Sequence, residues 1–399
     1  MLEEPLSRRA FLGTAAAAAV SAHPLARAAL ASQTALPKPG RSGIDHVVLV
    51  MMENRSFDHL LGWLPGANGR QAGLSYLDRA GAPHATFPLA PDFQGCAYHD
   101  PDHSYDGARA EWNNGACDGW LQVNDLWSIG YYRKQDLPFL GKAAPAFTTC
   151  DNFYASFMGP TFPNRIYSLS GVTDRVSNTT VRIELPTIFD RLAAKRVSAG
   201  YYYGSFSFML LYQTHKAIQH KRDVFFAQCR TGKLPAFSYV DPDWTFNDAG
   251  PSSGSEGNDD HPHADIRAGE YFLSQVYHAV TTSPAWPRTL LIVTFDEWGG
   301  FFDHVPPPAA RDVKPEYAQR GFRIPALLIS PFARRGHVAH DVYDHTSVLK
   351  LLEWRFGLEP LSERDATANN LATALDFSKR RLAAPPIHVP KLALGAPCP

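Results

Sequence analysis

Apolar and polar positions along the chain occur in blocks that predict buried strands separated by helices. Two short apolar runs rich in β-branched residues, 46–52 and 289–295, have the pattern of strands that are buried on both faces. Residues 197–203, 236–240 and 324–329 are predicted as further strands. Strands that alternate with helices predict an α/β fold, here a three-layer α/β/α sandwich with a mostly parallel sheet.

Helical spacing of apolar positions appears between these strands. Three segments carry it: 185–192, 212–229 and 266–280. A further helix is predicted to begin after Asp344, a natural N-cap, and to end at Gly357. His345, at the start of that helix, is equally compatible with a structural and a functional role.

Two stretches without sustained periodicity are predicted as loops. Residues 65–143 are rich in Gly, Pro, Asp and Asn, and long loops of this kind often line binding sites. Within them His103 is either a ligand or a solvated loop residue. The Gly/Ser/Asp-rich loop 246–260 ends at Asp260–His261, where either side chain is predicted to cap the next helix or to face the active site.

Hard oxygen ligands follow both buried strands. Glu53 and Asn54 come directly after the first strand, and Asp296 and Glu297 come directly after the other. Because open α/β sheets bind ligands at the carboxyl ends of their strands, these side chains are expected to meet in a divalent-cation site. Gly299–Gly300 would let the backbone turn sharply there. The alternative is a strand that ends in a solvated acidic turn.

Thr161 is predicted to lie at, or just before, the amino terminus of a helix. It follows a Gly159–Pro160 turn, and Pro163 suits the first turn of a helix. A helix amino terminus offers free N–H groups and a positive dipole end to a phosphate. Position alone also allows Thr161 to be an ordinary N-cap.

Composition narrows the classes of function. The 399 residues, 45% of them hydrophobic, suffice for a large core in one α/β domain or two. A formal net charge of −1 argues against a nucleic-acid binder. Five scattered cysteines without a C-x-x-C pair argue against a cysteine zinc site. Cys96 and Cys117 are one candidate disulfide, although sequence cannot establish the connectivity.

The amino terminus predicts export. Arg8 and Arg9 precede a weakly apolar, Ala-rich stretch, so residues 1–31 are predicted to be a twin-arginine signal peptide, the alternative being a disordered basic tail. The expected partner is the twin-arginine export machinery, and the expected location is periplasmic or secreted. A linker is predicted over 32–43, a catalytic domain over 44–380 and a Pro/Ala-rich tail over 381–399. No integral membrane segment is predicted, because no stretch has about 18 consecutive apolar residues.

Ordered motifs between Ile44 and Gly357 resemble the bacterial phosphoesterase family of phosphatidylcholine-type phospholipases C and related acid phosphatases. They are MENRSFDHLLG, GPTFPNRIYSLSG, HPHADIRAGE, DEWGGFFDHVPPP and RIPALLISPFARRG with YDHTSVLKLLEW. The resemblance implies an alkaline-phosphatase-like fold and hydrolysis of phosphate esters, phospholipids included, through a covalent phospho-enzyme. A broad acid phosphatase and a non-catalytic binding protein are the alternatives.

The resemblance also assigns roles to residues. It places one or more divalent cations, of calcium, magnesium, manganese or zinc, among a set of oxygen ligands: Glu53, Asn54, Thr161, Asp296 and Glu297. Thr161 is then the nucleophile rather than a cap, His103 and His261 lie near the phosphate or the leaving group, and Asn54 and His304 bind substrate. The chain departs from the family at Phe162, where histidine is frequent, so any role of that histidine is lost or supplied elsewhere. The short tail leaves monoesters and small soluble diesters open as substrates.

Overall fold

A mixed sheet lies at the centre of the fold in the computed structural model, which describes residues 36–245, 257–391 and 398. Its strands are β1 (His46–Met52), β6 (Thr148–Cys150), β8 (Ala199–Tyr203), β9 (Gln219–Lys221), β10 (Phe237–Val240), β11 (Thr289–Phe295), β12 (Ala326–Ile329) and β13 (His337–Ala339). They are arranged in the order β13-β6-β12-β11-β1-β10-β8-β9. The predicted signal peptide, 1–31, falls outside the described residues.

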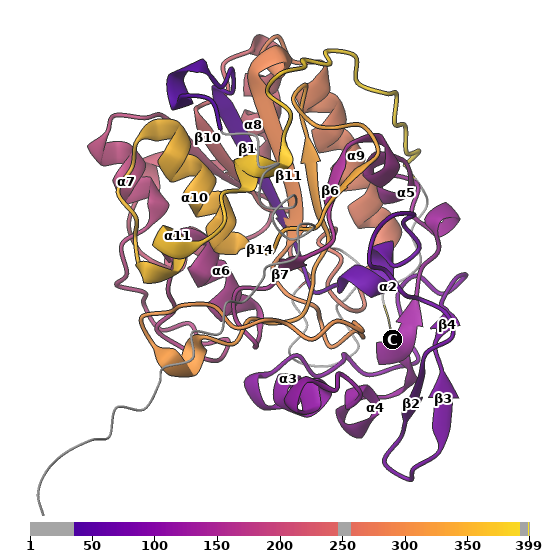
Figure 1. Ribbon diagram of the computed structural model, residues 1–399. Helices are drawn as coiled ribbons and strands as arrows, with labels where there is room; N and C mark the ends of the chain where they lie inside the picture. The colour runs from indigo at the N-terminus through magenta and orange to yellow at the C-terminus, as the bar shows by residue number, and fades with distance from the viewer. Residues whose placement is uncertain (1–35, 246–256, 392–397, 399) are drawn as a thin grey trace, which may run out of the picture. The chain divides into compact units, whose positions relative to one another are not determined.

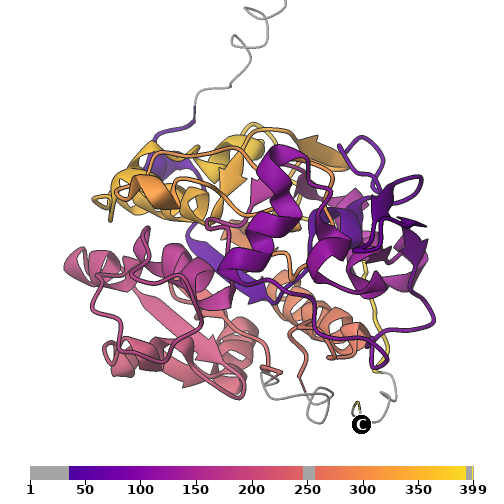
Figure 2. The ribbon, with the colours of Figure 1, turned by 90° about the horizontal axis from the view of Figure 1, so that it is seen from below.

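The central strand β1 pairs in parallel with both β10 and β11. Only β12, among the strands of this sheet, is antiparallel to its two neighbours, β11 and β6. The parallel strands therefore bring their carboxyl ends to one edge, which Figure 2 views from below. The predicted α/β sandwich with a mostly parallel sheet is confirmed.

Helices cover both faces of the sheet (Figure 1). One group consists of α6 (Thr161–Ser170), α7 (Ile188–Ala194), α10 (His345–Phe356) and α11 (Glu363–Thr367). The other contains α8 (Arg222–Thr231) and α9 (Ile266–Thr281), which pack against each other. As predicted, Asp344 is the N-cap of α10 and Gly357 ends this helix in a left-handed conformation.

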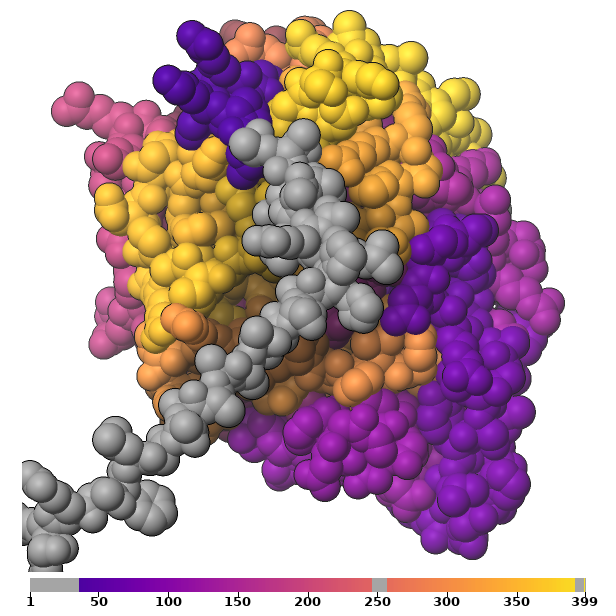
Figure 3. Space-filling view, in the orientation of Figure 1, coloured from indigo at the N-terminus to yellow at the C-terminus, as the bar shows by residue number. Residues whose placement is uncertain are grey.

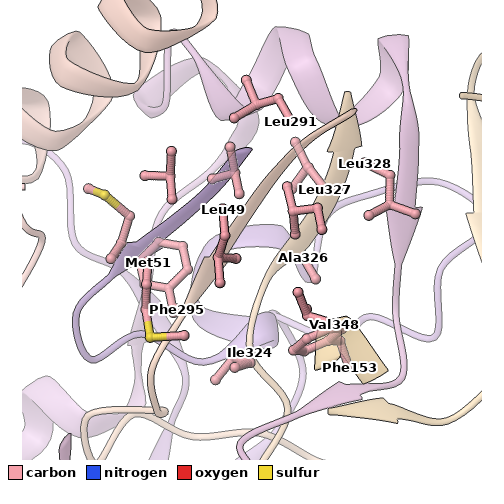
Figure 4. Close-up of a cluster of buried hydrophobic side chains, with 14 of the residues drawn as sticks. Leu49, Met51, Phe153, Leu291, Phe295, Ile324, Ala326, Leu327, Leu328 and Val348 are labelled. Atoms are coloured by element: carbon pink, nitrogen blue, oxygen red, sulfur yellow. The ribbon is translucent and has the colours of Figure 1, made fainter. Parts of the chain in front are cut away.

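Burial of apolar side chains explains why the central strands form. All seven residues of β11 and six of the seven in β1 are buried, as their unbroken apolar runs predicted. Figure 4 shows Leu49 of β1, Leu291 of β11 and Leu327 of β12 in a buried cluster that also contains Val348 of α10. Each fully buried side chain of this size contributes about 1.5–3 kcal/mol to folding, so the cluster holds strands and helices together.

The stretch 65–143 is more structured than its composition indicated. Its elements are β2 (Ser75–Leu77), β3 (Pro83–Ala85), β4 (Phe87–Pro88), β5 (Gly130–Tyr131), α3 (Tyr105–Trp112), α4 (Trp120–Val123) and α5 (Leu140–Ala143). Buried Trp120 and Trp127 join this segment to the core of the domain through contacts with Phe322 and Phe301. Such short elements do not produce a sustained period. In Figure 2 α3 lies across the carboxyl edge of the sheet, and in Figure 3 the purple surface at the lower right belongs to this segment.

The helix predicted over 212–229 is wrong in its first half. The structure has 3-10 turns at Phe208–Leu211 and Lys216–Ile218, then strand β9, and α8 begins only at Arg222. β9 pairs in parallel with β8 at the edge of the sheet. Pairing with a neighbouring strand therefore overrode local helical preference.

The remaining elements connect the layers. They are α2 (Phe57–Leu61), β7 (Phe153–Tyr154) and β14 (Tyr343–Asp344). Part of the predicted tail packs on the domain, since Tyr277 and Trp286 donate hydrogen bonds to the carbonyls of Pro385 and Leu382 at 2.6 and 2.7 Å. In the described part of the chain, no helix has the length and apolar character needed to cross a membrane.

The candidate disulfide Cys96–Cys117 is wrong. Cys96 pairs instead with Cys398, across 302 residues of sequence, and Cys117 is a buried free thiol. The short separation of Cys96 and Cys117 in sequence indicated the wrong partner because the fold brings Cys398 to Cys96. Connectivity of this kind depends on tertiary structure and is not contained in the spacing.

Candidate active site

The ends of β1 and β11 are joined directly to each other. The Asp296 N–H donates to the Met52 carbonyl, and the Asn54 N–H donates to Asp296 Oδ1, both at 3.0 Å. Asn54 has a φ of +56°, a left-handed conformation that asparagine tolerates better than most residues. The side chains of Glu53, Asn54, Asp296 and Glu297, all buried, thus gather at one place.

Thr161 begins helix α6, and its hydroxyl points to the end of β1. Thr161 Oγ1 lies 3.3 Å from Glu53 Oε2 and 3.4 Å from Asn54 Oδ1. The N-cap position belongs to Pro160, so the interpretation of Thr161 as an N-cap is wrong. Asn164 fixes the preceding turn, because its side-chain amide donates to the carbonyls of Gly159 and Pro160 at 2.8 and 3.1 Å.

Asp296 and Glu297 each turn one carboxylate oxygen to the protein and leave the other free. Asp296 Oδ1 accepts the N–H of Asn54 and of Glu297, and Glu297 Oε2 accepts the Gly299 N–H at 2.6 Å. Asp296 Oδ2 and Glu297 Oε1 are buried and have no hydrogen-bond donor among the described residues. Buried carboxylate oxygens without a donor are costly unless a cation is near.

The pKa shifts of Glu53 and Glu297 also indicate a site for a cation. Burial raises the pKa of Glu53 well above its usual value, and the charges of Asp296 and Asp259 raise it further against the opposing effect of Arg165. Burial and the neighbouring Asp296 also raise the pKa of Glu297 well above its usual value. Several carboxylates this close cannot all ionise without added positive charge. The donor set therefore fits a divalent cation with oxygen ligands.

Two glycines allow the strand ends to approach so closely. Gly299 has a φ of +65°, and a Cβ there would lie 2.1 Å from the Asn54 carbonyl oxygen. Gly300 has a φ of +69°, and its Cβ would lie 2.6 Å from Pro101 Cβ. A side chain at either position would push apart the segments that form the site. This agrees with the sharp turn expected at Gly299–Gly300.

Arg165 and Asp241 complete the site, and the sequence analysis missed both. Arg165 Nε donates to Glu53 Oε1 at 2.8 Å, and its Nη1 donates to Asp241 Oδ1 at 2.7 Å. Tyr201 donates to the other oxygen of Asp241. Two signals would have found them. Arg165 lies four residues after Thr161, on the same face of α6, and Asp241 directly follows β10 at the carboxyl edge of the sheet.

His103 and His261 lie beside this group and face each other across 5.9 Å between ring centroids. His103 Nε2 is 3.4 Å from Asn54 Nδ2 and 3.9 Å from Glu297 Oε1. His261 Nε2 is 4.0 Å from Asp100 Oδ2. Asp100, which the sequence analysis did not single out, therefore stands between the two rings. The helix after His261 is capped by Asp265, so the interpretation of Asp260 or His261 as its cap is wrong.

His304 is not brought to the same group. Its Nδ1 pairs with Asp58, and its Nε2 lies 3.2 Å from Asn68 Oδ1. Asp58 and Asp303 are in turn paired with the buried Arg323 at 3.1 and 2.8 Å. This neutralised cluster is a structural feature of the loop after Asp303. It does not bring His304 to Thr161.

The contacts of His345 and Phe162 indicate what each side chain does. The Ser156 N–H donates to His345 Nδ1 at 3.3 Å, so His345 Nε2 carries the proton that it donates to the Phe295 carbonyl at 2.9 Å. Burial lowers the pKa of His345, which favours this neutral, structural state. Phe162 packs edge-on against Phe208, at 5.2 Å between ring centroids, and cannot exchange a proton.

Comparison with known proteins identifies relatives over nearly the whole chain. A model of the Phosphoesterase family matches residues 44–359. Phospholipase C B of Mycobacterium tuberculosis is 29% identical, over 96% of this chain and 87% of that protein. Non-hemolytic phospholipase C of Pseudomonas aeruginosa is 30% identical, over 93% of this chain and 64% of that protein. Non-specific phospholipase C3 of Arabidopsis thaliana is 28% identical, over 88% and 77%.

Comparison with solved structures finds matches of low sequence identity. A protein of the alkaline phosphatase superfamily from Vibrio parahaemolyticus is 11% identical, with a TM-score of 0.41 over 82% of this chain and 70% of that one. Phosphonate monoester hydrolase of Agrobacterium radiobacter is 10% identical, with a TM-score of 0.39 over 79% of this chain and 74% of that one.

Proposed function

The chain belongs to the Phosphoesterase family and is a hydrolase of phosphoester bonds, and from this premise we propose that Thr161 is its covalent nucleophile. The observation that carries the proposal is the direction of the Thr161 hydroxyl, which points to Glu53 and Asn54 instead of capping its helix. The proposed substrate is a phospholipid or a similar phosphodiester, in line with the relatives named phospholipase C.

The proposed ligands of a divalent cation are the oxygen atoms gathered at the strand ends: Glu53, Asn54, Thr161, Asp296 and Glu297. A bound cation would lower the pKa of the Thr161 hydroxyl and neutralise charge on the phosphate. The free oxygens of Asp296 and Glu297 and the raised pKa of Glu53 and Glu297 support this set. These oxygen ligands suit magnesium, calcium or manganese better than a metal that prefers sulfur.

In the proposed reaction, Thr161 Oγ1 forms a bond to phosphorus while the bond to the alcohol oxygen breaks. The alcohol leaves with a proton, and water then attacks the phosphothreonine and restores the Thr161 hydroxyl. Of the N–H groups in the first turn of α6, that of Phe162 donates to Asn178 Oδ1 at 2.8 Å and Pro163 has none. The N–H of Thr161 itself is therefore the one placed to bind a phosphate oxygen. His103 and His261 are proposed to meet the leaving group.

Trapping the covalent intermediate tests the nucleophile. After acid quench during turnover, we expect mass spectrometry to find phosphate from p-nitrophenyl phosphate, or phosphocholine from phosphatidylcholine, on the peptide that contains Thr161. Thr161→Ala should lower turnover by several orders of magnitude, while Thr161→Ser keeps the oxygen and appreciable activity. Either group on another residue, or a near-normal rate for Thr161→Ala, would contradict the proposal.

Removal of metal tests the cation separately. Dialysis against a chelator should abolish activity, and one divalent cation returned in excess should restore it. The same treatment should lower the melting temperature, because an ion that binds only the folded state stabilises it. Glu53→Gln should weaken this stabilisation. Full activity with no change in melting temperature after complete removal of metal would contradict the proposed cation.

Export by the twin-arginine route remains part of the proposal. Its motivation is Arg8–Arg9 in the sequence, and the Cys96–Cys398 disulfide adds support because disulfides persist in oxidising compartments. Replacement of both arginines by lysine should retain the protein in the cytoplasm. Unimpaired export of that variant would show that another signal is used.

A further inference from the structure

Three segments that are distant in sequence meet at the amino edge of the sheet, opposite the active site. β12 is antiparallel to β11, so its last residue, Ile329, lies near the start of β11, and 330–335 follows at this edge. The Phe332 carbonyl accepts the Asp376 N–H at 2.8 Å, and the Pro331 carbonyl accepts the Arg381 N–H at 2.7 Å. The segment 376–383 therefore packs beside 330–335. This edge is at the top of Figure 1, whereas α3 is at the bottom.

Phe332 also joins the residues before β1 to this edge. A Cβ at Gly43 would lie 2.8 Å from Phe332 Cζ, so the chain passes directly over the ring. The Arg380 guanidinium lies 5.9 Å from the centre of the same ring. Arg335 donates a hydrogen bond to the Ala383 carbonyl. The segments 38–43, 330–335 and 376–383 thus form one continuous surface.

This surface carries an excess of positive charge. Asp45 pairs with Arg288 and Arg355, and Asp376 pairs with Arg381, so these two carboxylates are already used. Other cations here have no carboxylate within 4.0 Å in the described part of the chain. We call them the basic surface: Lys38, Arg41, Arg334, Arg335, Lys379 and Arg380. Five of the six are exposed, and Arg334 is half-buried.

The active-site edge has the opposite charge. The cavity of about 660 Å³ beside Pro160, the residue before Thr161, is lined by Asp100, Asp102 and Asp106. Because the whole chain has a formal net charge of −1, the positive charge of the amino edge is a local excess. A negatively charged partner would be attracted to the amino edge and repelled at the cavity. The charge distribution therefore sets the orientation in which such a partner is met.

An apolar side chain projects from the basic surface. Leu382 is 52% exposed, although its backbone is fixed, since its carbonyl accepts from Trp286 Nε1 at 2.7 Å. Arg335 holds the carbonyl of the next residue. Insertion of Leu382 into a partner would therefore cost little ordering of the chain. Cations around an exposed leucine suit the boundary between head groups and acyl chains of an anionic bilayer. A nucleic-acid backbone would use the cations alone.

We propose that the basic surface, with Leu382, binds an anionic lipid surface. Each cation close to such a surface contributes about a fivefold gain in affinity. Because the active site lies at the opposite edge of the sheet, the bound enzyme faces away from the membrane that holds it. Its substrate then arrives from solution or from another surface. The inference depends neither on Thr161 nor on the proposed cation.

Flotation with lipid vesicles tests the surface on the purified chain. One set of vesicles is phosphatidylcholine alone, and the other is phosphatidylcholine and phosphatidylglycerol mixed two to one. We expect binding to the anionic vesicles and at least tenfold weaker binding to the neutral ones. Raising the salt from about 0.1 M to about 1 M should release the protein, because the screening length falls from about 10 Å to about 3 Å. Lipid is extracted after each run and shown to be intact.

A triple charge variant tests the cations. Lys38→Gln with Arg41→Gln and Lys379→Gln removes side chains that form no ion pair within the described residues. It should weaken binding to anionic vesicles roughly 100-fold, since three cations are lost. The control replaces three exposed cations outside the basic surface by glutamine and should bind like the wild type: Arg133, Arg182 and Lys216. Each variant is first shown to unfold at a melting temperature near that of the wild type.

A second pair of variants tests the apolar contact. Leu382→Ser should weaken binding to anionic vesicles several-fold, because the leucine no longer enters the bilayer. Leu77→Ser is the matched control, since Leu77 is 54% exposed on β2, and it should bind like the wild type.

Equal binding to neutral and anionic vesicles, or wild-type binding by the triple charge variant, would overturn the inference. Tighter binding to an oligonucleotide than to anionic vesicles at the same salt, unaffected by Leu382→Ser, would overturn the lipid as the partner. The triple charge variant should hydrolyse p-nitrophenyl phosphate at the wild-type rate, and Thr161→Ala should bind vesicles like the wild type. Absence of phosphothreonine with intact vesicle binding would overturn the nucleophile and leave the lipid-binding surface standing.

Discussion

At the scale of single residues, Arg165 determines which carboxylate oxygen of Glu53 faces Thr161. Its guanidinium binds Glu53 Oε1 and Asp241, so Glu53 Oε2 is the oxygen left to face Thr161. Arg165, Glu53 and Asp241 are all buried. Removal of the arginine would leave two carboxylates in a low-dielectric site without their counter-charge, and breaking a buried pair is costly for this reason.

We predict that Arg165→Met lowers the free energy of unfolding by about 3–5 kcal/mol, measured by urea denaturation in chelator. Arg182→Met is the control, because Arg182 and Glu184 are exposed and 3.9 Å apart, and it should cost less than about 1 kcal/mol. Returned divalent cation should recover part of the loss, since it restores positive charge beside Glu53. Equal losses of unfolding free energy in the two variants would show that the buried ion pair contributes no more to stability than the exposed one.

The residue scale also shows what sequence reasoning can and cannot find. Glu53 and Asp296 were placed together from one rule, that parallel strands share a carboxyl edge, and the same rule applied to β10 would have found Asp241. Asp100 is different. It lies in an irregular segment, and its position between His103 and His261 depends on tertiary packing that no period or spacing encodes.

At the scale of elements, α9 is attached to α5 through a buried carboxyl group. Glu270 of α9 accepts hydrogen bonds from the N–H groups of Phe139 and Leu140, the latter at 3.1 Å. Burial raises the pKa of Glu270 to about 8, although these two bonds lower it. The unfolded chain has the ordinary value of 4.5, so between these two values the folded state holds a proton that the unfolded state has lost. Stability from this group is therefore complete below about pH 4.5 and declines as the pH rises to about 8.

We predict that Glu270→Gln flattens this part of the pH dependence. The difference in unfolding free energy between variant and wild type should shift in favour of the variant by on the order of 2 kcal/mol from pH 5 to pH 8. Chemical denaturation at several pH values measures it. Glu184→Gln, an exposed position, should follow the wild type at every pH. A constant difference between Glu270→Gln and wild type across this range would contradict the prediction.

Strands and helices could be predicted from the sequence where burial is continuous along the element, and could not be predicted where it is not. β1 and β11 were recognised because all their positions except His46 are buried, which requires a nearly continuous apolar run. The edge strand β9 has only three partly buried or exposed residues, and its polar sequence looked like the start of α8. The same reason explains why the short helices and strands of 65–143 were interpreted as one loop.

At the scale of the whole domain, one covalent bond joins parts that are distant in sequence. Cys96 lies in the 65–143 segment, which packs over the carboxyl edge of the sheet, and Cys398 is the next-to-last residue. Pro385 and Leu382 accept hydrogen bonds from Tyr277 of α9 and from Trp286 in the turn before β11. The disulfide thus ties the end of the chain to the segment that contains Asp100 and His103.

We predict that loss of this bond destabilises the protein without removing its catalytic groups. Closing a long loop restricts the unfolded chain, so Cys398→Ser should lower the unfolding free energy by about 2–4 kcal/mol. A reducing agent should lower the melting temperature of the wild type to that of Cys398→Ser and should not change the variant. Cys229→Ala, at a buried free thiol, is the control that keeps the response to reductant.

The same disulfide also tests the compartment, because disulfides do not persist in a reducing cytoplasm. Protein retained in a reducing cytoplasm by replacement of Arg8 and Arg9 should therefore show five reactive thiols after denaturation, against three for the exported form. Three reactive thiols in both forms would separate the disulfide from export and remove its support for the oxidising compartment.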